Sequence, residues 1–141
     1  MTEQELVGAA RGIVEAFNAG DWEGYAAALA PDCVYDEVAT SRIFKGTDEI
    51  IACLKSWKEA MPDVTGTINS TLSTGNSVVL EITWEGTHTG PLEGPSGTVE
   101  ATGKHQTTRA GWVLEFDGGK NTASRHYFDM LSFFQQLEVL P

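Results

Sequence analysis

The chain has 141 residues and a formal net charge of −11, with 9 Lys and Arg against 20 Asp and Glu. This length suits one domain with a single core. The acidity argues against nucleic acid as a partner, because phosphate binding needs clustered Lys and Arg. No apolar run is long enough to span a membrane. The acidic N-terminus lacks the pattern of a signal peptide, so we expect a cytoplasmic protein.

The two cysteines, Cys33 and Cys53, are expected to be reduced thiols in that compartment. Together with the three histidines they stand at long, irregular spacing, which matches no zinc signature. We therefore expect neither a metal site nor a cofactor.

The first part of the chain has helical spacing. Thr2 and Glu5 are predicted to form a capping box, and apolar residues follow every three or four positions. Gly20 is a natural C-terminal cap for this helix. Asp21 is a natural start for a second, shorter helix, which we expect Pro31 to end.

A short strand is predicted at residues 33–38. Thr47 is predicted to cap a third helix, which stops at Met61 and Pro62. Beyond this point the apolar period changes to two. The remaining predictions are strands at 64–74, 77–89, 98–116 and 121–128, turns at 75–76 and 117–119, a loop at 90–97 and a short helix at 130–137.

Helices that are segregated from antiparallel strands indicate an α+β domain. We expect a long, curved antiparallel sheet that wraps around the N-terminal helices and encloses a pocket. Four Trp in one small domain suggest that this pocket takes a flat, hydrophobic small molecule. The predicted substrate-binding residues are Phe17, Trp22, Tyr25, Tyr35, Trp57, Trp84 and His105, with the facing of His105 left open.

This order of elements, with Asn-Ala-Gly-Asp-Trp at residues 18–22, resembles the nuclear transport factor 2-like superfamily. Within it, several segments look like the SnoaL-like polyketide cyclase group: Trp-Glu-Gly-Thr-His-Thr-Gly at 84–90, Gly-Pro-Ser-Gly at 94–97, Asp-Gly-Gly-Lys at 117–120, Tyr-Phe-Asp at 127–129 and Gln-Leu at 136–137. The resemblance implies one SnoaL-like domain over residues 1–141, a cone-shaped fold with a deep pocket, and a homodimer.

Asp129 is the first catalytic candidate. It lies in an apolar stretch, where the pKa of a carboxyl group tends to rise until it becomes a usable proton carrier. In the cyclases that the chain resembles, the matching aspartate is the general acid/base of an intramolecular aldol closure. The alternative is structural, since Asp129 immediately precedes a predicted helix whose free amides its carboxylate would cap.

Strand alternation places Arg125, Tyr127 and Asp129 on one face of the last strand and His126 and Phe128 on the other. Tyr127 is therefore the expected partner of Asp129, as a hydrogen-bond donor to a developing enolate. Its alternative is a half-buried core tyrosine. We expect His126 to serve packing or an interface.

His88 and Asp36 are the other catalytic candidates. Alternation puts His88 on the core side of its strand, where it would suit proton transfer, or would hold the loop that follows through its backbone. The Val-Tyr-Asp-Glu-Val run at 34–38 resembles the strand that carries the catalytic aspartate of ketosteroid isomerases. Asp36 would then line the pocket, or else be a solvated charge at a strand end.

These features predict a cofactor-free acid/base enzyme for a hydrophobic, ketone-bearing substrate. It would be polyketide cyclase-like, closing a ring by an intramolecular aldol reaction, or isomerase-like. Two alternatives stay open: a hydrolase or dehydratase with an Asp–His pair in the pocket, and a non-catalytic protein that binds a small hydrophobic molecule.

Overall fold

The computed structural model describes residues 1–94 and 97–139. Six strands form one mixed sheet in the order β2-β1-β8-β7-β4-β3, and β5 and β6 form a separate two-stranded antiparallel sheet. The elements are α1 (Glu3–Ala19), α2 (Trp22–Ala27), β1 (Leu29–Glu37), the 3-10 helix η1 (Val38–Thr40), β2 (Arg42–Lys45), α3 (Thr47–Ala60), β3 (Thr65–Thr74), β4 (Ser77–Thr87), β5 (Leu92–Gly94), β6 (Gly97–Val99), β7 (His105–Asp117), β8 (Lys120–Phe128) and α4 (Met130–Leu137).

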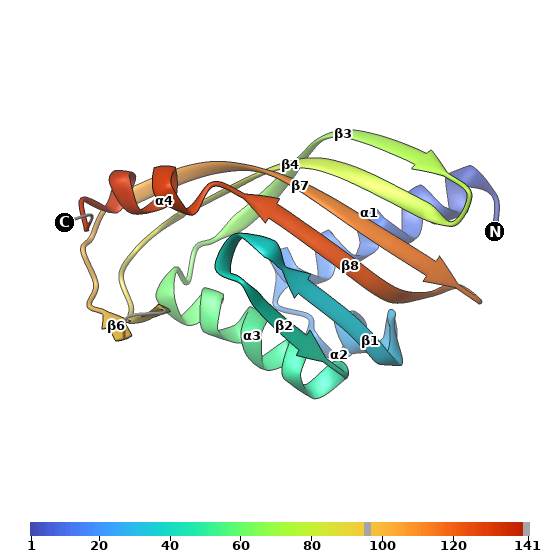
Figure 1. The fold of residues 1–141 in the computed structure, drawn as a ribbon, viewed down its shortest axis with the longest axis horizontal. Coiled ribbons are helices and arrows are strands. Elements are labelled where there is room, and N and C mark those ends of the chain that lie inside the picture. Colours follow the sequence, from blue (N-terminus) through green and yellow to red (C-terminus); the bar gives the residue numbers. More distant parts are fainter. Residues whose placement is uncertain (95–96, 140–141) are drawn as a thin grey trace.

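The long strands β4, β7 and β8 run side by side in Figure 1, with α4 at one end of the sheet and α1 crossing behind it. Helix α1 packs against β3 and β4, α3 against β1 and β2, and α4 against β7. The core lies between these helices and one face of the sheet. The predicted α+β architecture, with a curved sheet over N-terminal helices, is confirmed; the sheet does not close.

The predicted boundaries of α1 are confirmed. Thr2 Oγ1 accepts a hydrogen bond from the Glu5 amide at 3.1 Å, and the Glu5 carboxylate accepts one from the Thr2 amide at 2.9 Å. Gly20 adopts φ +69°, which an L side chain rarely does, and its amide caps the last turn. Asp21 starts α2 by accepting from the Gly24 amide.

The predicted end of the second helix is wrong. Helix α2 ends at Ala27, and the chain enters β1 at Leu29, so Pro31 lies inside the strand. Proline has no N–H to give to a sheet. The pairing of β1 with β8 shifts register between Leu29 and Val34, which accommodates it.

The sheet is mixed rather than antiparallel throughout. Strand β1 pairs with β8 in parallel. The elements from β2 to β7 separate the two strands in the chain, and parallel strands require a long connection of this kind. Strand β2, which the sequence analysis did not predict, pairs with the other edge of β1. Thr47 is the first residue of α3 and not its cap, since Gly46 is the N-cap and makes no side-chain bond.

The strand predicted at 98–116 is two elements. Strand β6 ends at Val99 and β7 starts at His105. Between them Gly103 turns with φ +71°, and its amide donates to the carbonyl of His88 at 2.8 Å. A local turn therefore interrupts a run whose composition is typical of a strand.

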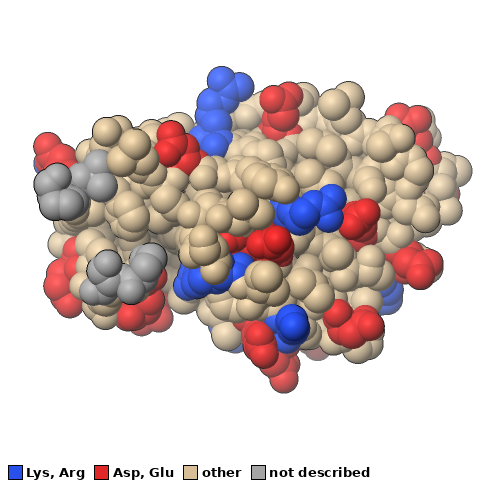
Figure 2. Space-filling view, viewed as in Figure 1, with Lys and Arg blue, Asp and Glu red and all other residues tan. Residues whose placement is uncertain are grey.

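On the face shown in Figure 2, acidic and basic side chains are interspersed. In the described ranges, no helix is long and apolar enough to cross a membrane. Nor do three or more His, Cys, Asp or Glu side chains of these residues group closely enough to hold a metal ion.

Candidate functional site

A pocket opens between the sheet and helices α1–α4. About 600 Å³ of space inside it is not filled by atoms, a figure that includes open solvent at its mouth. Aromatic rings form most of its wall. The residues that line it are Phe17, Tyr25, Tyr35, Glu37, Leu54, Trp57, Met61, Val64, Trp84, Gln106, Thr108, Trp112, His126, Phe128 and Phe133.

Strand β1 brings a carboxylate into this apolar wall. Cys33, Tyr35 and Glu37 alternate on its buried face, and Glu37 is 0 % exposed. Asp36 points the other way and faces Arg125 of β8 in the register. The pocket carboxylate at this end of the strand is therefore Glu37, one residue beyond the predicted Asp36.

Five donors surround the Glu37 carboxylate. Thr40 Oγ1 and the Arg42 guanidinium donate to Oε1, each at 2.6 Å. The Tyr35 hydroxyl donates to Oε2 at 2.9 Å and Trp57 Nε1 at 3.0 Å, with the Cys53 thiol further away at 3.6 Å. A carboxylate has about four lone-pair sites, so this one has no acceptor position to spare.

These contacts keep Glu37 ionised. Burial by itself would raise the pKa of the carboxyl group, but the hydrogen bonds from Thr40 and Arg42 and the charge of Arg42 lower it below its ordinary value. The charge is thus stable inside an apolar wall only because both oxygens are fully partnered.

His126 of β8 connects to this carboxylate through Tyr35. Its Nδ1 lies 2.8 Å from the Tyr35 hydroxyl, and Trp84 Nε1 donates to its Nε2 at 3.1 Å. An indole N–H can only donate, so Nε2 is an acceptor and the proton of the neutral ring is on Nδ1. His126 then donates to Tyr35, and Tyr35 donates to Glu37, which gives one chain of aligned hydrogen bonds.

The protonation states of this chain follow from burial. Burial lowers the pKa of His126 to about 4, and the nearby Glu37 charge only partly opposes this. Burial and the same charge raise the pKa of Tyr35 well above its ordinary value. At neutral pH the ring of His126 is neutral and the Tyr35 hydroxyl keeps its proton.

Aromatic packing fixes the orientation of the chain. The indole of Trp112 stacks on the imidazole of His126, with centroids 4.8 Å apart and planes 19° apart. Phe17 meets the ring of Trp84 edge-on at 5.2 Å. Gly66 on β3 makes room for that indole, because a Cβ at this position would stand 2.6 Å from the Trp84 ring.

Two donors in the wall are not used up by this network. Trp112 Nε1 is buried and has no partner among the described residues. The amide nitrogen of Gln106 contacts a weak acceptor, the sulfur of Met61, at 3.4 Å, while its oxygen accepts from Thr108. A buried N–H without an acceptor costs about 1–3 kcal/mol.

Five of the predicted substrate-binding residues line the pocket: Phe17, Tyr25, Tyr35, Trp57 and Trp84. Trp22 is outside the lining and packs edge-on against Phe17 at 5.9 Å. His105 is exposed, where it contacts the Thr87 hydroxyl and the Glu85 carboxylate.

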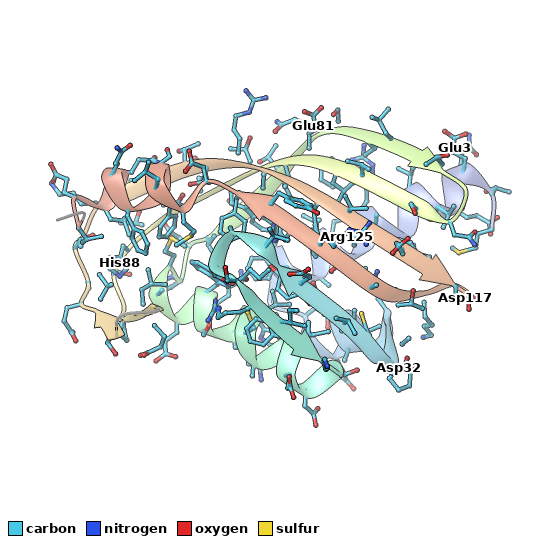
Figure 3. The ribbon with its side chains drawn as sticks, in the orientation of Figure 1. Glu3, Asp32, Glu81, His88, Asp117 and Arg125 are labelled. Atoms are coloured by element: carbon cyan, nitrogen blue, oxygen red, sulfur yellow. The ribbon has the colours of Figure 1, made fainter. Side chains whose placement is uncertain are left out.

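The structure does not bring the predicted catalytic residues together. His88 is 0 % exposed, and its Nδ1 accepts from the amide of Thr102. It lies toward the loop end of the molecule in Figure 3, away from Arg125 on β8. This contact matches the alternative that His88 holds a loop, although the loop is at residues 100–104 rather than 90–97.

Asp129 is exposed at the N-terminus of α4 and is not part of the lining. Its Oδ1 accepts from the Ser132 amide at 3.1 Å, as expected for a helix cap. Tyr127 is 46 % exposed on the outer face of β8. The proton-transfer roles predicted for Asp129 and Tyr127 stay predictions, and their positions give them no contact with the pocket.

Most polar residues of the pocket were not predicted from the sequence. Glu37 was obscured by the resemblance that favoured Asp36, although the alternation of Cys33 and Tyr35 indicates it. Alternation correctly separated His126 and Phe128 from Tyr127 and Asp129, but His126 was assigned to packing or an interface and catalysis was expected on the opposite face. Gln106, Thr108 and Trp112 alternate along the buried face of β7, which gives the same periodic signal.

A second, outer hollow lies next to the pocket. It is lined by Thr40, Arg42, Trp57, Leu92, Glu93, Gly94, Met130 and Phe134. Trp57 lines both hollows. Glu37 spans the wall between them, because its Oε1 binds Thr40 and Arg42 on the outer side and its Oε2 binds Tyr35 and Trp57 on the inner side.

Comparisons with solved structures show the fold. The putative hydroxylase AclR from Streptomyces galilaeus is 23% identical, with a TM-score of 0.84, and the match covers 99% of this chain and 100% of that one. A putative SnoaL-like polyketide cyclase from Jannaschia sp. CCS1 is 16% identical, with a TM-score of 0.87 and coverage of 99% and 95%. An LEH-like epoxide hydrolase from M. tuberculosis is 21% identical, with a TM-score of 0.74 and coverage of 96% and 90%.

No curated protein matches the chain. The model of the SnoaL-like polyketide cyclase family matches residues 8–137, which is nearly the whole sequence. The chain therefore belongs to the SnoaL-like polyketide cyclase family.

Proposed function

We propose that the chain is a cofactor-free acid/base catalyst for a flat, hydrophobic, ketone-bearing molecule, polyketide cyclase-like or isomerase-like in its chemistry. The observation that carries this proposal is the aligned chain His126–Tyr35–Glu37 in the wall of an aromatic pocket. Family membership supports the same class of chemistry.

His126 is the group that takes the proton. The neutral imidazole has its Nδ1 occupied by Tyr35, so Nε2 accepts the proton from the carbon next to the ketone, after Trp84 gives up its hydrogen bond. The electron pair of the broken C–H bond moves to the ketone oxygen as an enolate. The Glu37 charge, relayed through the Tyr35 dipole, offsets the positive charge that the imidazolium carries.

The test uses 2-tetralone, a flat aromatic ketone, as the probe. In D₂O we expect the wild type to speed the exchange of its α-hydrogens, followed by NMR. His126→Gln removes the base, and the enzymatic rate should fall about a hundredfold or more. Asp129→Asn is the matched control, since asparagine also caps helices, and it should retain the wild-type rate.

A His126→Gln protein that folds normally and exchanges at the wild-type rate would contradict the assignment. Loss of exchange in Asp129→Asn would instead assign the role of the catalytic base to Asp129. Circular dichroism and thermal unfolding of each variant separate these results from misfolding.

A non-catalytic binding protein is the second candidate, and one observation favours it. Both nitrogens of His126 and both oxygens of Glu37 are already hydrogen-bonded, and Asp129 is engaged by a backbone amide. Binding of 2-tetralone without any exchange above buffer would support this candidate over catalysis.

A hydrolase or dehydratase would need an ionisable pair in the pocket. The described lining contains no aspartate, so the pair would be Glu37 and His126, with Tyr35 bridging them. Homodimer formation stays a prediction, which a molar-mass measurement at micromolar concentration checks.

A further inference from the structure

The pocket wall contains a hydrogen-bond donor for which residues 1–94 and 97–139 supply no acceptor. Within the described residues, three buried side-chain atoms lack a partner: Ser73 Oγ, His88 Nε2 and Trp112 Nε1. Only Trp112 lines the pocket. The other two Trp in the wall differ in this respect, because the N–H of Trp57 binds Glu37 and that of Trp84 binds His126.

We propose that Trp112 Nε1 holds the ketone oxygen of the ligand and sets the specificity of the pocket for an oxygen acceptor at that point. This deepens the proposed function and rests on it for the ligand class. An apolar ligand would leave the N–H buried and unpaired, whereas a carbonyl oxygen satisfies it.

The position of Trp112 fits this role. It faces His126 directly across β7 and β8, and the two rings are stacked at 4.8 Å. The indole and the imidazole that we propose takes the proton therefore lie side by side in the wall of the pocket. As the C–H bond breaks, negative charge develops on the ketone oxygen, and its hydrogen bond to the indole N–H becomes stronger.

The chemistry of the wall limits the ligand further. Trp112 can only donate, so it selects for an acceptor. Glu37, whose carboxylate is the only one in the described lining, is already paired with Arg42 and saturated with donors. The pocket is therefore suited to a neutral, flat molecule that carries a carbonyl, and not to an alkylammonium ion.

The experiment compares 2-tetralone with tetralin, the same frame without the oxygen, by equilibrium dialysis. Trp112→Phe keeps an aromatic ring and removes the N–H. It should weaken 2-tetralone binding by about three- to tenfold and leave tetralin binding within about twofold. The control, Trp22→Phe, makes the same change outside the lining and should leave the ratio of the two affinities unchanged.

Two further readings separate this role from ordinary packing. The α-hydrogen exchange rate of Trp112→Phe should fall by more than its affinity for 2-tetralone, because the bond is stronger to the enolate. Without ligand, Trp112→Phe should lower the melting temperature less than Trp57→Phe, which loses a hydrogen bond to Glu37. Equal weakening of both probes by Trp112→Phe would overturn the proposal.

Failure here is distinguishable from failure of the proposed function. If the affinity ratio is unchanged while the wild type still exchanges 2-tetralone, Trp112 loses its role and His126 keeps its own. If the ratio changes while neither the wild type nor any variant speeds the exchange of 2-tetralone, Trp112 keeps the oxygen-binding role and the proposed catalytic function is contradicted.

Discussion

The two faces of β8 both carry polar side chains, but the side chains on the inner face are buried and those on the outer face lie near solvent. On the inner face His126 is 6 % exposed, hydrogen-bonded on both sides and stacked on Trp112. On the outer face Tyr127 is half exposed, and Arg125 pairs with Glu115 at 3.0 Å near solvent. One residue of spacing separates a group with a strongly shifted pKa from groups that water screens. Residues that are adjacent in this strand therefore do not share a site.

The largest difference between the inner and outer faces of the sheet should appear when a carboxylate on each face is neutralised. Glu37→Gln removes the charge that Arg42 and four other donors need in a buried site, and it should lower the free energy of unfolding by about 3–5 kcal/mol. Glu115→Gln breaks the outer ion pair and should change it by less than about 0.5 kcal/mol. Urea unfolding measures both, and similar losses would contradict the comparison.

The second difference is pH dependence. The pKa of His126 is about 4 in the folded protein and about 6.5 when unfolded. Between these values the unfolded chain binds more protons, so stability is full above pH 6.5 and falls with decreasing pH by about 3 kcal/mol at pH 4. His126→Gln should remove this part of the curve.

The low pKa of Glu37 acts at more acidic pH. Its contribution is present above the unfolded value and is lost as the pH falls below it, so it remains in His126→Gln. Denaturation curves at several pH values check both. An identical dependence for wild type and variant between pH 6.5 and 4 would show that His126 is not buried as a neutral ring.

A third contrast compares the two tyrosines. Tyr35→Phe removes the hydroxyl that joins Glu37 to His126 and leaves a buried ring nitrogen without a partner, which should cost about 2 kcal/mol. Tyr127→Phe removes an exposed hydroxyl and should stay within about 0.5 kcal/mol. Thermal unfolding distinguishes them, and a destabilised Tyr127→Phe would place Tyr127 in a contact that the outer face does not show.

The smallest effect concerns the cap that follows β8. Asp129→Ala should cost about 1 kcal/mol, because the Ser132 amide loses its acceptor, whereas Asp129→Asn should cost little. A structural cap affects only stability, and a catalytic carboxylate affects the exchange of 2-tetralone in both variants. The pair of substitutions thus separates the two roles in one experiment.

Local signals in the sequence were enough for much of the fold. The capping box of Thr2 and Glu5 gave the start of α1, and period-two alternation gave the faces of β4 and β8. The parallel pairing of β1 with β8 was not accessible in this way, because it joins segments about ninety residues apart. The break before β7 depends on a contact of Gly103 with His88, which composition does not encode.

The site was harder to predict for the same reason. The aromatic wall could be anticipated from residue types, and five of the chosen rings line it. The missing partner of Trp112 cannot be read from sequence, since an unpaired N–H is defined by every residue around it. Glu37 was within reach of alternation, but the resemblance to another family's aspartate favoured its neighbour.

The single carboxylate of Glu37 has a consequence for any attempt to redesign this protein. Because its two oxygens join the inner pocket to the outer hollow, a substitution made to alter reactivity also removes a support of β1, η1 and α3. Variants with new substrates will therefore be found more readily by changing apolar wall residues, or by replacing Glu37 and Arg42 together, than by exchanging one polar residue at a time.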